Sequence, residues 1–362
     1  MAAHAGVSVG TASRVLNDEA SVAADMRERV LLAVEETGYR RLRARTVGAE
    51  TEIAFLAVLR DVDEARPELD YFWAGILKGA EVHARRSGAR ISYRALHGLD
   101  HDRSVAEQLG GSAPEHALLV GPAPDASIRE LRDMGVSLVL VDNAIEGEPI
   151  VSVNSDNFGG SLLVMEHLLG LGHRRIAYVG GPPRSGAPDA DAIHSISLRT
   201  LGYRHALERR GISVDPALVA RCDLSVDGAA TAVERLLDDG AQFSAVFCAN
   251  DPAAAGAIRA LRRRGLSVPG HVSVAGYDDQ FGDHVEPRLT TVRVDRTALG
   301  ATAVDALLAV ARAAHPLPPA TRVVPVEFVR GASTSAPVAL APVAGAPEVD
   351  GTTDAGTVGD SS

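Results

Sequence analysis

The 362-residue chain has few cysteines and no long apolar run. Two cysteines, Cys222 and Cys248, are too few for a disulfide framework and lack the paired spacing of a structural zinc site, which argues against metal-thiolate chemistry. No run of about 18 apolar residues is present to span a membrane, and the start has no basic, apolar leader for export. We therefore expect a cytoplasmic protein without a membrane partner.

Lysine is almost absent, and the net charge is negative. Lys78 is the only lysine and the formal net charge is −11, which argues against a protein that coats nucleic acid over its whole surface. The charge is uneven, however, because residues 1–17 hold Arg14 and no acidic side chain, and four arginines fall between positions 40 and 45. Basic charge is thus concentrated near the start, where contact with nucleic acid remains open.

Apolar runs alternate with helix-period segments from residue 53 onward. The strand-like runs are 53–59, 90–96, 116–121, 137–142, 175–180, 245–250 and 272–279, and helices are expected from about Phe72, Ser197 and Asp251. This alternation predicts an α/β body of parallel sheets covered by helices. Ligands of such sheets bind at the carboxyl ends of the strands. Six polar residues fall there: Asp142, Asn143, Asn250, Asp251, Asp278 and Asp279.

These carboxylates allow two interpretations. Clustered aspartates can bind magnesium or act as acid and base, but no phosphate-binding loop, nucleophile elbow or His-Glu-x-x-His motif accompanies them. A polar cleft that recognises hydroxyl groups explains the set better, because such side chains form paired hydrogen bonds without doing chemistry. For Asp251, capping of a helix before Pro252 is an equally adequate account. We expect no enzyme activity, no cofactor and no metal.

The opening stretch predicts a small helical unit. AAHAGVSVGTASRVLN is typical of the end of one helix, a tight turn at residues 6–8 and a second helix capped by Ser8. A third helix is predicted from about Ala24 to Thr37, with Gly38 at its C-cap. The side chains expected to be buried are Ala5, Val7, Ala12, Val15 and Leu16, together with a stripe of Met26, Val30, Ala33 and Val34.

This arrangement is a helix-turn-helix. The second helix has small polar side chains, as it needs to enter a DNA major groove about 12 Å wide, where side chains reach base edges. Arg14 is the natural base or phosphate contact. The alternative is an ordinary three-helix bundle whose exposed face happens to be polar.

The sequence AGVSVGTASRVLN, followed by residues 27–30 (Arg-Glu-Arg-Val) and 36–39 (Glu-Thr-Gly-Tyr), closely resembles the headpiece of the LacI/GalR family of bacterial transcriptional regulators. In that family the headpiece begins several residues earlier, and Met1 stands where a valine is expected, so we expect a truncated headpiece that binds DNA poorly. The resemblance implies base-reading roles for Val9, Gly10 and Arg14. It implies backbone contacts or caps at Ser8, Thr11, Ser13 and Asn17.

The family hinge, Tyr-x-Pro-Asn-x-x-Ala-Arg-x-Leu, is only partly matched. Residues 39–47 are Tyr-Arg-Arg-Leu-Arg-Ala-Arg-Thr-Val, without the Pro-Asn pair. The resemblance implies a minor-groove wedge at Val47, with Arg43 and Arg45 attracted to phosphates. Alternatively, these arginines belong to a linker that is simply exposed to solvent.

The likeness continues to about Thr334. The matching phrases are residues 151–157, 172–182, 197–207, 248–261, 268–280 and 286–292. It implies a core similar to a periplasmic sugar-binding protein, with two α/β subdomains, chain crossings near 155, 276 and 292, and an effector held between the subdomains. By motif position, it makes Arg199 the residue that grips the effector. The other implied lining residues are Phe72, Asp142, Ser195, Asn250 and Asp278.

Two departures from the family pattern concern the ligand. The segment 182–196 is longer than usual and rich in Pro, Gly and Asp, and Leu224 stands where many sugar-binding members carry an aromatic platform.

Four segments are therefore expected. They are a helix-turn-helix headpiece at 1–39, a hinge at 40–51, an effector-binding and dimerisation core at 52–332, and a disordered tail of small and polar residues at 333–362. The expected function is a repressor that binds operator DNA as a homodimer under control of a small-molecule effector, a sugar in first place. The alternatives are a nucleobase-responsive regulator and a solute-binding protein without a DNA role.

Overall fold

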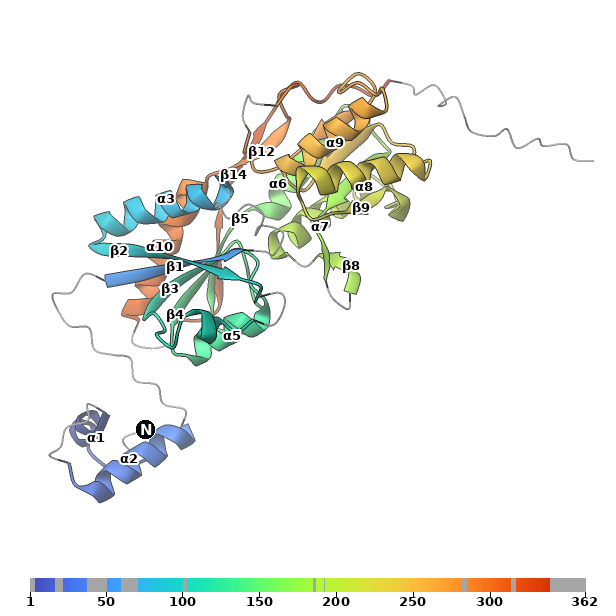
Figure 1. The fold of residues 1–362 in the computed structure, drawn as a ribbon. Coiled ribbons are helices and arrows are strands. Elements are labelled where there is room, and N and C mark those ends of the chain that lie inside the picture. The colour runs from blue at the N-terminus through green and yellow to red at the C-terminus, as the bar shows by residue number, and fades with distance from the viewer. Residues whose placement is uncertain are drawn as a thin grey trace, which may run out of the picture. The chain divides into compact units, whose positions relative to one another are not determined.

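The computed structural model describes residues 4–16, 22–37, 51–59, 71–99, 103–184, 187–191, 193–281, 285–313 and 317–338, and helices and strands alternate through them (Figure 1). The chain divides into two compact units. Unit 1 comprises Met1–Phe158, Pro183–Arg199 and Val294–Glu327, and unit 2 comprises Gly159–Pro182, Thr200–Arg293 and Phe328–Ser362. No helix in these described ranges is long and apolar enough to cross a membrane.

The headpiece contains α1 (Val9–Leu16) and α2 (Ala24–Thr37), at the positions predicted. Ser8 Oγ accepts a hydrogen bond from the Thr11 N–H at 3.0 Å, which confirms the predicted N-cap. Residues 4–6 form a turn in which Gly6 has a φ of 64°, and the residues before them, to which the predicted end of an earlier helix extends, lie outside the described residues. Arg29 holds that turn by donating to the carbonyls of Ala5 and Gly6 at 2.7 and 3.0 Å.

A small apolar core joins the two helices. Ala5, Ala12, Val15, Val30 and Ala33 are buried as predicted, with Val7 and Val22 partly buried against them. Met26 was expected in the same stripe but is 38% exposed, because the short α1 covers α2 only around Val30 and Ala33. The side chains of Leu16 and Val34, and all of Gly38, lie outside the described residues.

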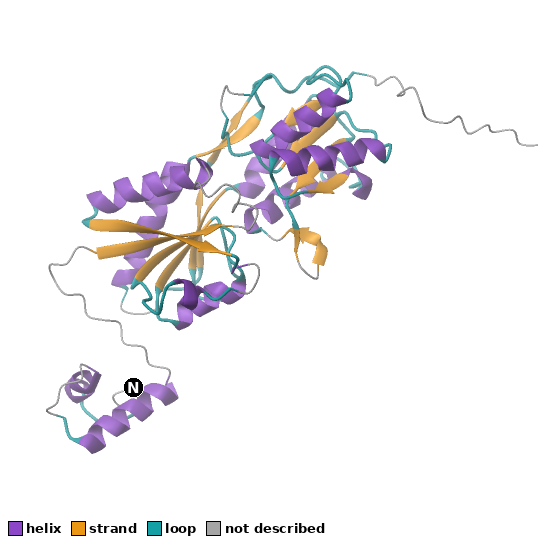
Figure 2. Cartoon of the chain, in the orientation of Figure 1, coloured by secondary structure: helices purple, strands orange, loops and turns teal. Residues whose placement is uncertain are grey.

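Unit 1 contains a six-stranded parallel sheet in the order β13-β5-β4-β3-β1-β2. The strands are β1 (Thr51–Leu59), β2 (Ala89–His97), β3 (His116–Val120), β4 (Ser137–Val141), β5 (Val151–Ser155) and β13 (Ala320–Val324). Seven consecutive residues of β1 are buried, because helices cover both faces of the sheet, and this explains the continuous apolar run of its sequence (Figure 2).

Two helices of unit 1 approach each other closely. α3 (Tyr71–Arg86) packs against α10 (Arg296–Arg312). A Cβ on Gly300 would lie 2.1 Å from the Ile76 carbonyl oxygen, and one on Gly79 would lie 2.2 Å from the Thr297 carbonyl oxygen. Short helices α4 (Val105–Gln108) and α5 (Asp125–Asp133) contribute to a separate apolar core with β1 and β3. A two-stranded antiparallel ribbon, β7 (Pro183–Arg184) and β8 (Ala187–Asp191), completes the unit.

Unit 2 contains a four-stranded parallel sheet in the order β11-β10-β6-β9. The strands are β6 (Ile176–Gly180), β9 (Val219–Arg221), β10 (Ala245–Cys248) and β11 (Ser273–Ala275). The accompanying helices are the 3-10 turn η3 (Pro216–Leu218), α8 (Val226–Asp238) and α9 (Asp251–Arg263). Two further helices, α6 (Asn157–Gly170) and α7 (His194–Glu208), begin in unit 1 and continue in unit 2 after Phe158 and Arg199. All seven predicted strands and all three predicted helices are therefore present in the two units, and the α/β prediction is confirmed.

The chain changes unit at 158/159, 293/294 and 327/328, and segment 183–199 also belongs to unit 1. The last two changes lie in β12 (Thr291–Val294) and β14 (Val326–Val329), which pair with each other. Crossings predicted near 155 and 292 are confirmed, but the one near 276 is wrong. Gly276 and Asp278 stay in unit 2 because their N–H groups donate to the carbonyls of Thr290 and Val292 at 2.9 and 2.8 Å.

The segment 333–338 belongs to the ordered body, so the predicted start of the tail at 333 is wrong. Ser333 is fully buried, accepts from the Thr290 N–H at 2.8 Å and donates to the Val274 carbonyl at 2.6 Å. The Ser335 N–H donates to Ser273 Oγ at 3.0 Å. The tail was predicted from its lack of large apolar side chains. Composition does not reveal the hydrogen bonds that order residues 333–338. Residues 339–362 lie outside the described residues.

Two truncations test the contribution of the segment 333–338 to stability. We expect a chain that ends at Val338 to melt like the full-length protein. A chain that ends at Ala332 should be less stable by roughly 1 to 3 kcal/mol for each buried partner left unsatisfied, such as the Thr290 N–H. Thermal unfolding of the three chains measures this, and equal melting of the shorter chain would contradict it.

Candidate functional site

The predicted DNA-reading face lies on α1. Ser8 caps this helix, Thr11 and Arg14 are neighbours on its surface because they are three residues apart, and Arg14 is exposed. Ser8 Oγ and Thr11 Oγ1 lie 2.9 Å apart. Val9, Gly10 and Ser13 belong to the same helix, but the structure does not describe how far these three residues are buried. The remaining predicted contacts also lie outside the described residues: Asn17, Arg43, Arg45 and Val47.

Three of the four effector residues predicted in unit 1 gather at one edge of its sheet. Asp142 directly follows β4 and is 5% exposed, and Ser195 Oγ donates to its Oδ2 at 3.2 Å. Arg199 lies one turn after Ser195 on α7, so both side chains point to the same side of that helix. Arg199 is 2% exposed, and its Nε donates to Asn157 Oδ1 at 2.8 Å.

Asn157 is a buried member of this cluster that the sequence interpretation missed. It begins α6, two residues after the end of β5, and its Nδ2 donates to the Ser155 carbonyl at 3.1 Å. This amide orients the Arg199 guanidinium and satisfies part of its hydrogen-bonding capacity. The signal was its position at the end of a strand, the same criterion that selected Asp142.

Phe72 is buried in α3, at the same carboxyl edge of the sheet. Its ring meets Trp73 edge to face, with centroids 5.0 Å apart at 84°. A Cβ on Gly121, which follows β3, would lie 3.4 Å from the Trp73 ring. The aromatic pair therefore lies near the carboxyl ends of the strands.

The other two predicted effector residues, Asn250 and Asp278, belong to unit 2. Asn250 is the N-cap of α9, accepting from the Ala253 N–H at 2.9 Å, and its Nδ2 donates to the Leu224 carbonyl at 3.1 Å. Leu224 has a φ of 68°, a left-handed conformation that residues other than glycine rarely adopt. The alternative that Asp251 caps the helix is thus wrong, because the preceding residue, Asn250, performs that role.

The Asp251 carboxylate instead joins three parts of unit 2. It is 1% exposed, with Oδ2 accepting from the Gln280 N–H and Oδ1 from Thr291 Oγ1, both at 2.7 Å. Burial raises the pKa of this carboxyl to about 7; the nearby Asp278 and Asp279 also raise it, whereas its two hydrogen bonds lower it. Asp251 connects α9 to β12 and to the turn after β11.

The raised pKa of Asp251 makes stability depend on pH. A folded-state pKa of about 7 against an ordinary value of 3.8 means that this group's stabilisation is complete below pH 4 and is lost as the pH rises through 7. Asp251→Asn keeps both hydrogen bonds, because the amide can accept from Gln280 and donate to Thr291 Oγ1. We therefore expect the free energy of unfolding of the variant, relative to that of wild type, to rise by on the order of 3 to 4 kcal/mol from pH 4 to pH 8.

Denaturant unfolding at the two pH values measures this change. The exposed carboxylate Asp238, which pairs with Arg264, provides the matched control Asp238→Asn. Burial lowers the pKa of His167 and of His173, but both histidines are present in all variants and cancel in the comparison. If the difference in free energy of unfolding between Asp251→Asn and wild type stayed constant with pH, the pKa of Asp251 would not be raised in the folded state.

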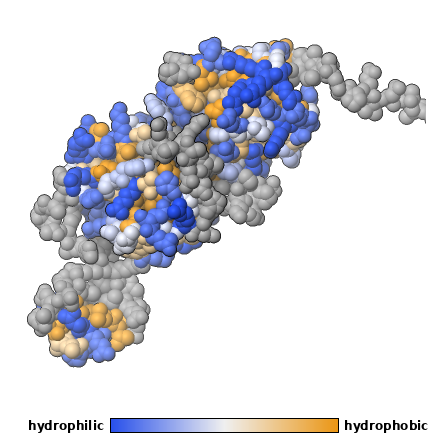
Figure 3. Space-filling model, viewed as in Figure 1, coloured by the Kyte–Doolittle hydropathy of each residue, from blue (hydrophilic) through white to orange (hydrophobic). Residues whose placement is uncertain are grey.

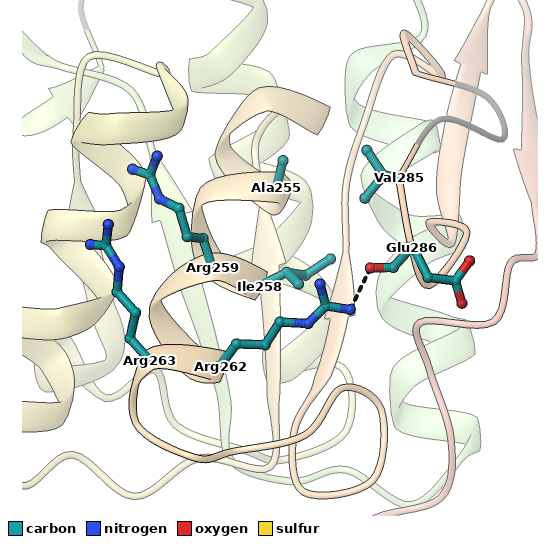
Figure 4. A pocket seen from close by; sticks show the side chains of 7 residues that line it. All are labelled: Ala255, Ile258, Arg259, Arg262, Arg263, Val285 and Glu286. Atoms are coloured by element: carbon teal, nitrogen blue, oxygen red, sulfur yellow. Dashed lines mark hydrogen bonds between the residues drawn. The ribbon is translucent and has the colours of Figure 1, made fainter.

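Unit 2 has a hollow of about 550 Å³ that none of the predicted effector residues lines (Figure 4). Its lining includes Arg259, Arg262 and Arg263 of α9, and Figure 3 shows hydrophilic residues gathered over α8 and α9. Arg259 pairs with Asp227 and Arg263 with Glu234, at 2.6 and 3.1 Å. Arg262 donates to the Glu286 carbonyl at 2.6 Å. All three arginines thus already bind carboxylates or a carbonyl of unit 2, and the lining of the hollow includes none of the predicted effector residues.

Among the residues that the structure describes, no group of three or more His, Cys, Asp or Glu side chains is arranged to hold a metal ion. Cys222 and Cys248 are not joined by a disulfide, and burial raises the pKa of the Cys248 thiol.

Comparisons with known proteins match both parts of the chain. The family of bacterial regulatory proteins named lacI matches residues 1–41, and the periplasmic binding protein-like domain matches residues 165–334. The transcriptional regulator GalR of Escherichia coli (strain K12) is 32% identical over 343 residues, which cover 92% of this chain and 94% of GalR.

Solved structures agree with this relationship. A complex of the regulator CelR with cellobiose is 30% identical, with a TM-score of 0.69, and the match covers 92% of this chain and 98% of CelR. The lac repressor dimer bound to operator and the anti-inducer ONPF is 27% identical, with a TM-score of 0.65 and the same coverage, 92% and 98%. The chain belongs to the LacI family of bacterial regulatory proteins and is a DNA-binding transcriptional regulator.

Proposed function

We propose that this regulator is a repressor that binds a pseudo-palindromic operator as a homodimer and is controlled by a small neutral sugar. One recognition helix reads only a few base pairs, so a two-fold protein on a two-fold site supplies the required specificity. The lac repressor structure, a dimer on its operator, supports this arrangement. The protein acts by binding alone, in the cytoplasm where its operator lies, and its relatives are regulators rather than enzymes.

The observation that carries the effector proposal is the buried polar cluster of unit 1. Its carboxylate, hydroxyl, amide and guanidinium groups offer paired donors and acceptors, which suits vicinal hydroxyl groups. The cellobiose bound by CelR supports a sugar. We assign effector contacts to Phe72, Asp142, Ser195 and Arg199 of unit 1 and to Asn250 and Asp278 of unit 2.

The DNA-binding role of α1 is tested at Arg14. Arg14→Ala should weaken binding to a fragment from the upstream region of the protein's own gene by roughly 1 to 3 kcal/mol, because a side chain that reaches bases is lost. Non-specific binding should fall much less. A fluorescence titration with that fragment and with a scrambled duplex measures both affinities.

Arg322→Ala is the matched control for charge, since Arg322 is exposed on β13, outside the headpiece. It should leave specific binding within about twofold of wild type. If Arg14→Ala lowered binding to both duplexes equally, α1 would not be the base-reading helix.

A further inference from the structure

The turn after β11 has an uncommon backbone. Asp278 has a φ of 98° and Asp279 a φ of 49°, so two consecutive residues other than glycine occupy the left-handed region. Such conformations persist only where surrounding bonds support them, and they cluster at functional sites. Asp278 is also 5% exposed and is the effector residue assigned to this turn.

Two neighbouring elements hold the turn. On the side of β12, the Asp278 N–H donates to the Val292 carbonyl at 2.8 Å, and Asp278 forms a parallel bridge with Arg293. On the side of α9, Asp251 Oδ2 accepts from the Gln280 N–H at 2.7 Å. The turn therefore cannot change shape without disturbing β12 or the start of α9.

An ion pair adds a side-chain tie to the same strand. Arg293 Nε donates to Asp279 Oδ2 at 2.7 Å, with the Asp279 side chain 12% exposed and that of Arg293 45% exposed. The chain enters unit 1 directly after Arg293. Two residues later, Asp295 caps α10 by accepting from the Ala298 N–H at 2.9 Å. Arg293 thus stands at the point where the strand leaves unit 2.

We propose that Asp279 and Arg293 form a positioning pair, which holds Asp278 in its ligand-contacting conformation and links that conformation to the crossing strand β12. This inference rests on the proposed function, in which Asp278 contacts the effector. A ligand that shifts the turn also shifts Arg293, and the strand carries that shift along the chain toward α10. The pair therefore contributes to effector affinity and to the response of DNA binding.

The exposure of the pair favours a geometric role over a stabilising one. Partly exposed ion pairs contribute little to global stability, because solvent and salt screen them. An arginine guanidinium, however, fixes the direction of a carboxylate through its planar donors, which a lysine does not do. Loss of the pair should therefore alter the turn while the global unfolding transition stays nearly unchanged.

Hydrogen exchange of the full chain without ligand tests the positioning directly. In Arg293→Gln and in Asp279→Asn, the amides of residues 276–280 should exchange at least about tenfold faster than in wild type. Exchange of the β10 amides should not change. The double variant should equal either single variant, because both remove the same pair. Arg263→Gln breaks the Arg263–Glu234 pair of the same unit and is the matched control. Unchanged exchange at 276–280 in Arg293→Gln would overturn the inference.

Calorimetry with cellobiose and D-galactose tests the consequence for ligand. For whichever sugar wild type binds, Arg293→Gln should bind at least about tenfold more weakly, Arg293→Lys should recover only part of the loss, and DNA binding without sugar should stay within about twofold. Equal sugar binding by wild type and Arg293→Gln would overturn the pair's role. If wild type binds neither sugar, the proposed effector class fails, and the exchange result still decides the positioning pair.

Discussion

Arg199→Ala is expected to abolish the response of DNA binding to sugar. Arg199 is 2% exposed and Asn157 orients its guanidinium, so it offers a fixed, charged donor at the carboxyl edge of the sheet. A hydrogen bond from a charged group contributes about 1.5 to 3 kcal/mol, so sugar affinity should fall roughly 10-fold to 100-fold or more. Calorimetry and DNA titration in the presence and absence of sugar measure both effects.

The same variant should bind DNA normally without sugar, because Arg199 belongs to α7 and not to the headpiece. Arg209→Ala removes an exposed arginine beyond the end of α7 and serves as the matched control. Arg199→Lys keeps the charge but loses the planar donors, so it should respond more weakly than wild type. A normal sugar response by Arg199→Ala would remove Arg199 from the effector site.

Gly300→Ala is expected to destabilise unit 1 by roughly 3 kcal/mol or more. The added Cβ would lie 2.1 Å from the Ile76 carbonyl oxygen and 2.6 Å from the Ala80 backbone nitrogen, distances at which α3 and α10 must separate. Both helices also pack on the unit 1 sheet, so their separation loosens the core around them. Denaturant unfolding gives the change in free energy.

Gly170→Ala is the control for the intrinsic effect of replacing a helical glycine. Gly170 ends α6, and a Cβ built there meets nothing within 4 Å. Its replacement should be neutral or slightly stabilising, because alanine favours helix more than glycine does. If Gly300→Ala unfolded like Gly170→Ala, the close approach of α3 and α10 would be wrong.

The sequence by itself determined the local elements. The bounds of α2 were predicted from its C-terminal signals and its periodicity, and Ser8 was recognised as the cap of α1. The burial of β1 on both faces follows from its continuous apolar run. These features depend on neighbours within a few residues, so the sequence contains the information needed to predict them. The edge of the sheet where Asp142 and Ser195 meet was predictable for the same reason, since strand ends are local features.

The tertiary structure alone decided which polar groups pair. Ser195 and Asp142 are 53 positions apart, and Asp251 and Thr291 are 40 apart, so local patterns do not identify them as partners. Pro252 made helix capping an equally adequate account of Asp251, and the lack of large apolar side chains predicted a disordered tail from Ser333, but both residues hold buried hydrogen bonds. Buried polar residues depend for their stability on specific partners, and only the folded chain brings those partners together.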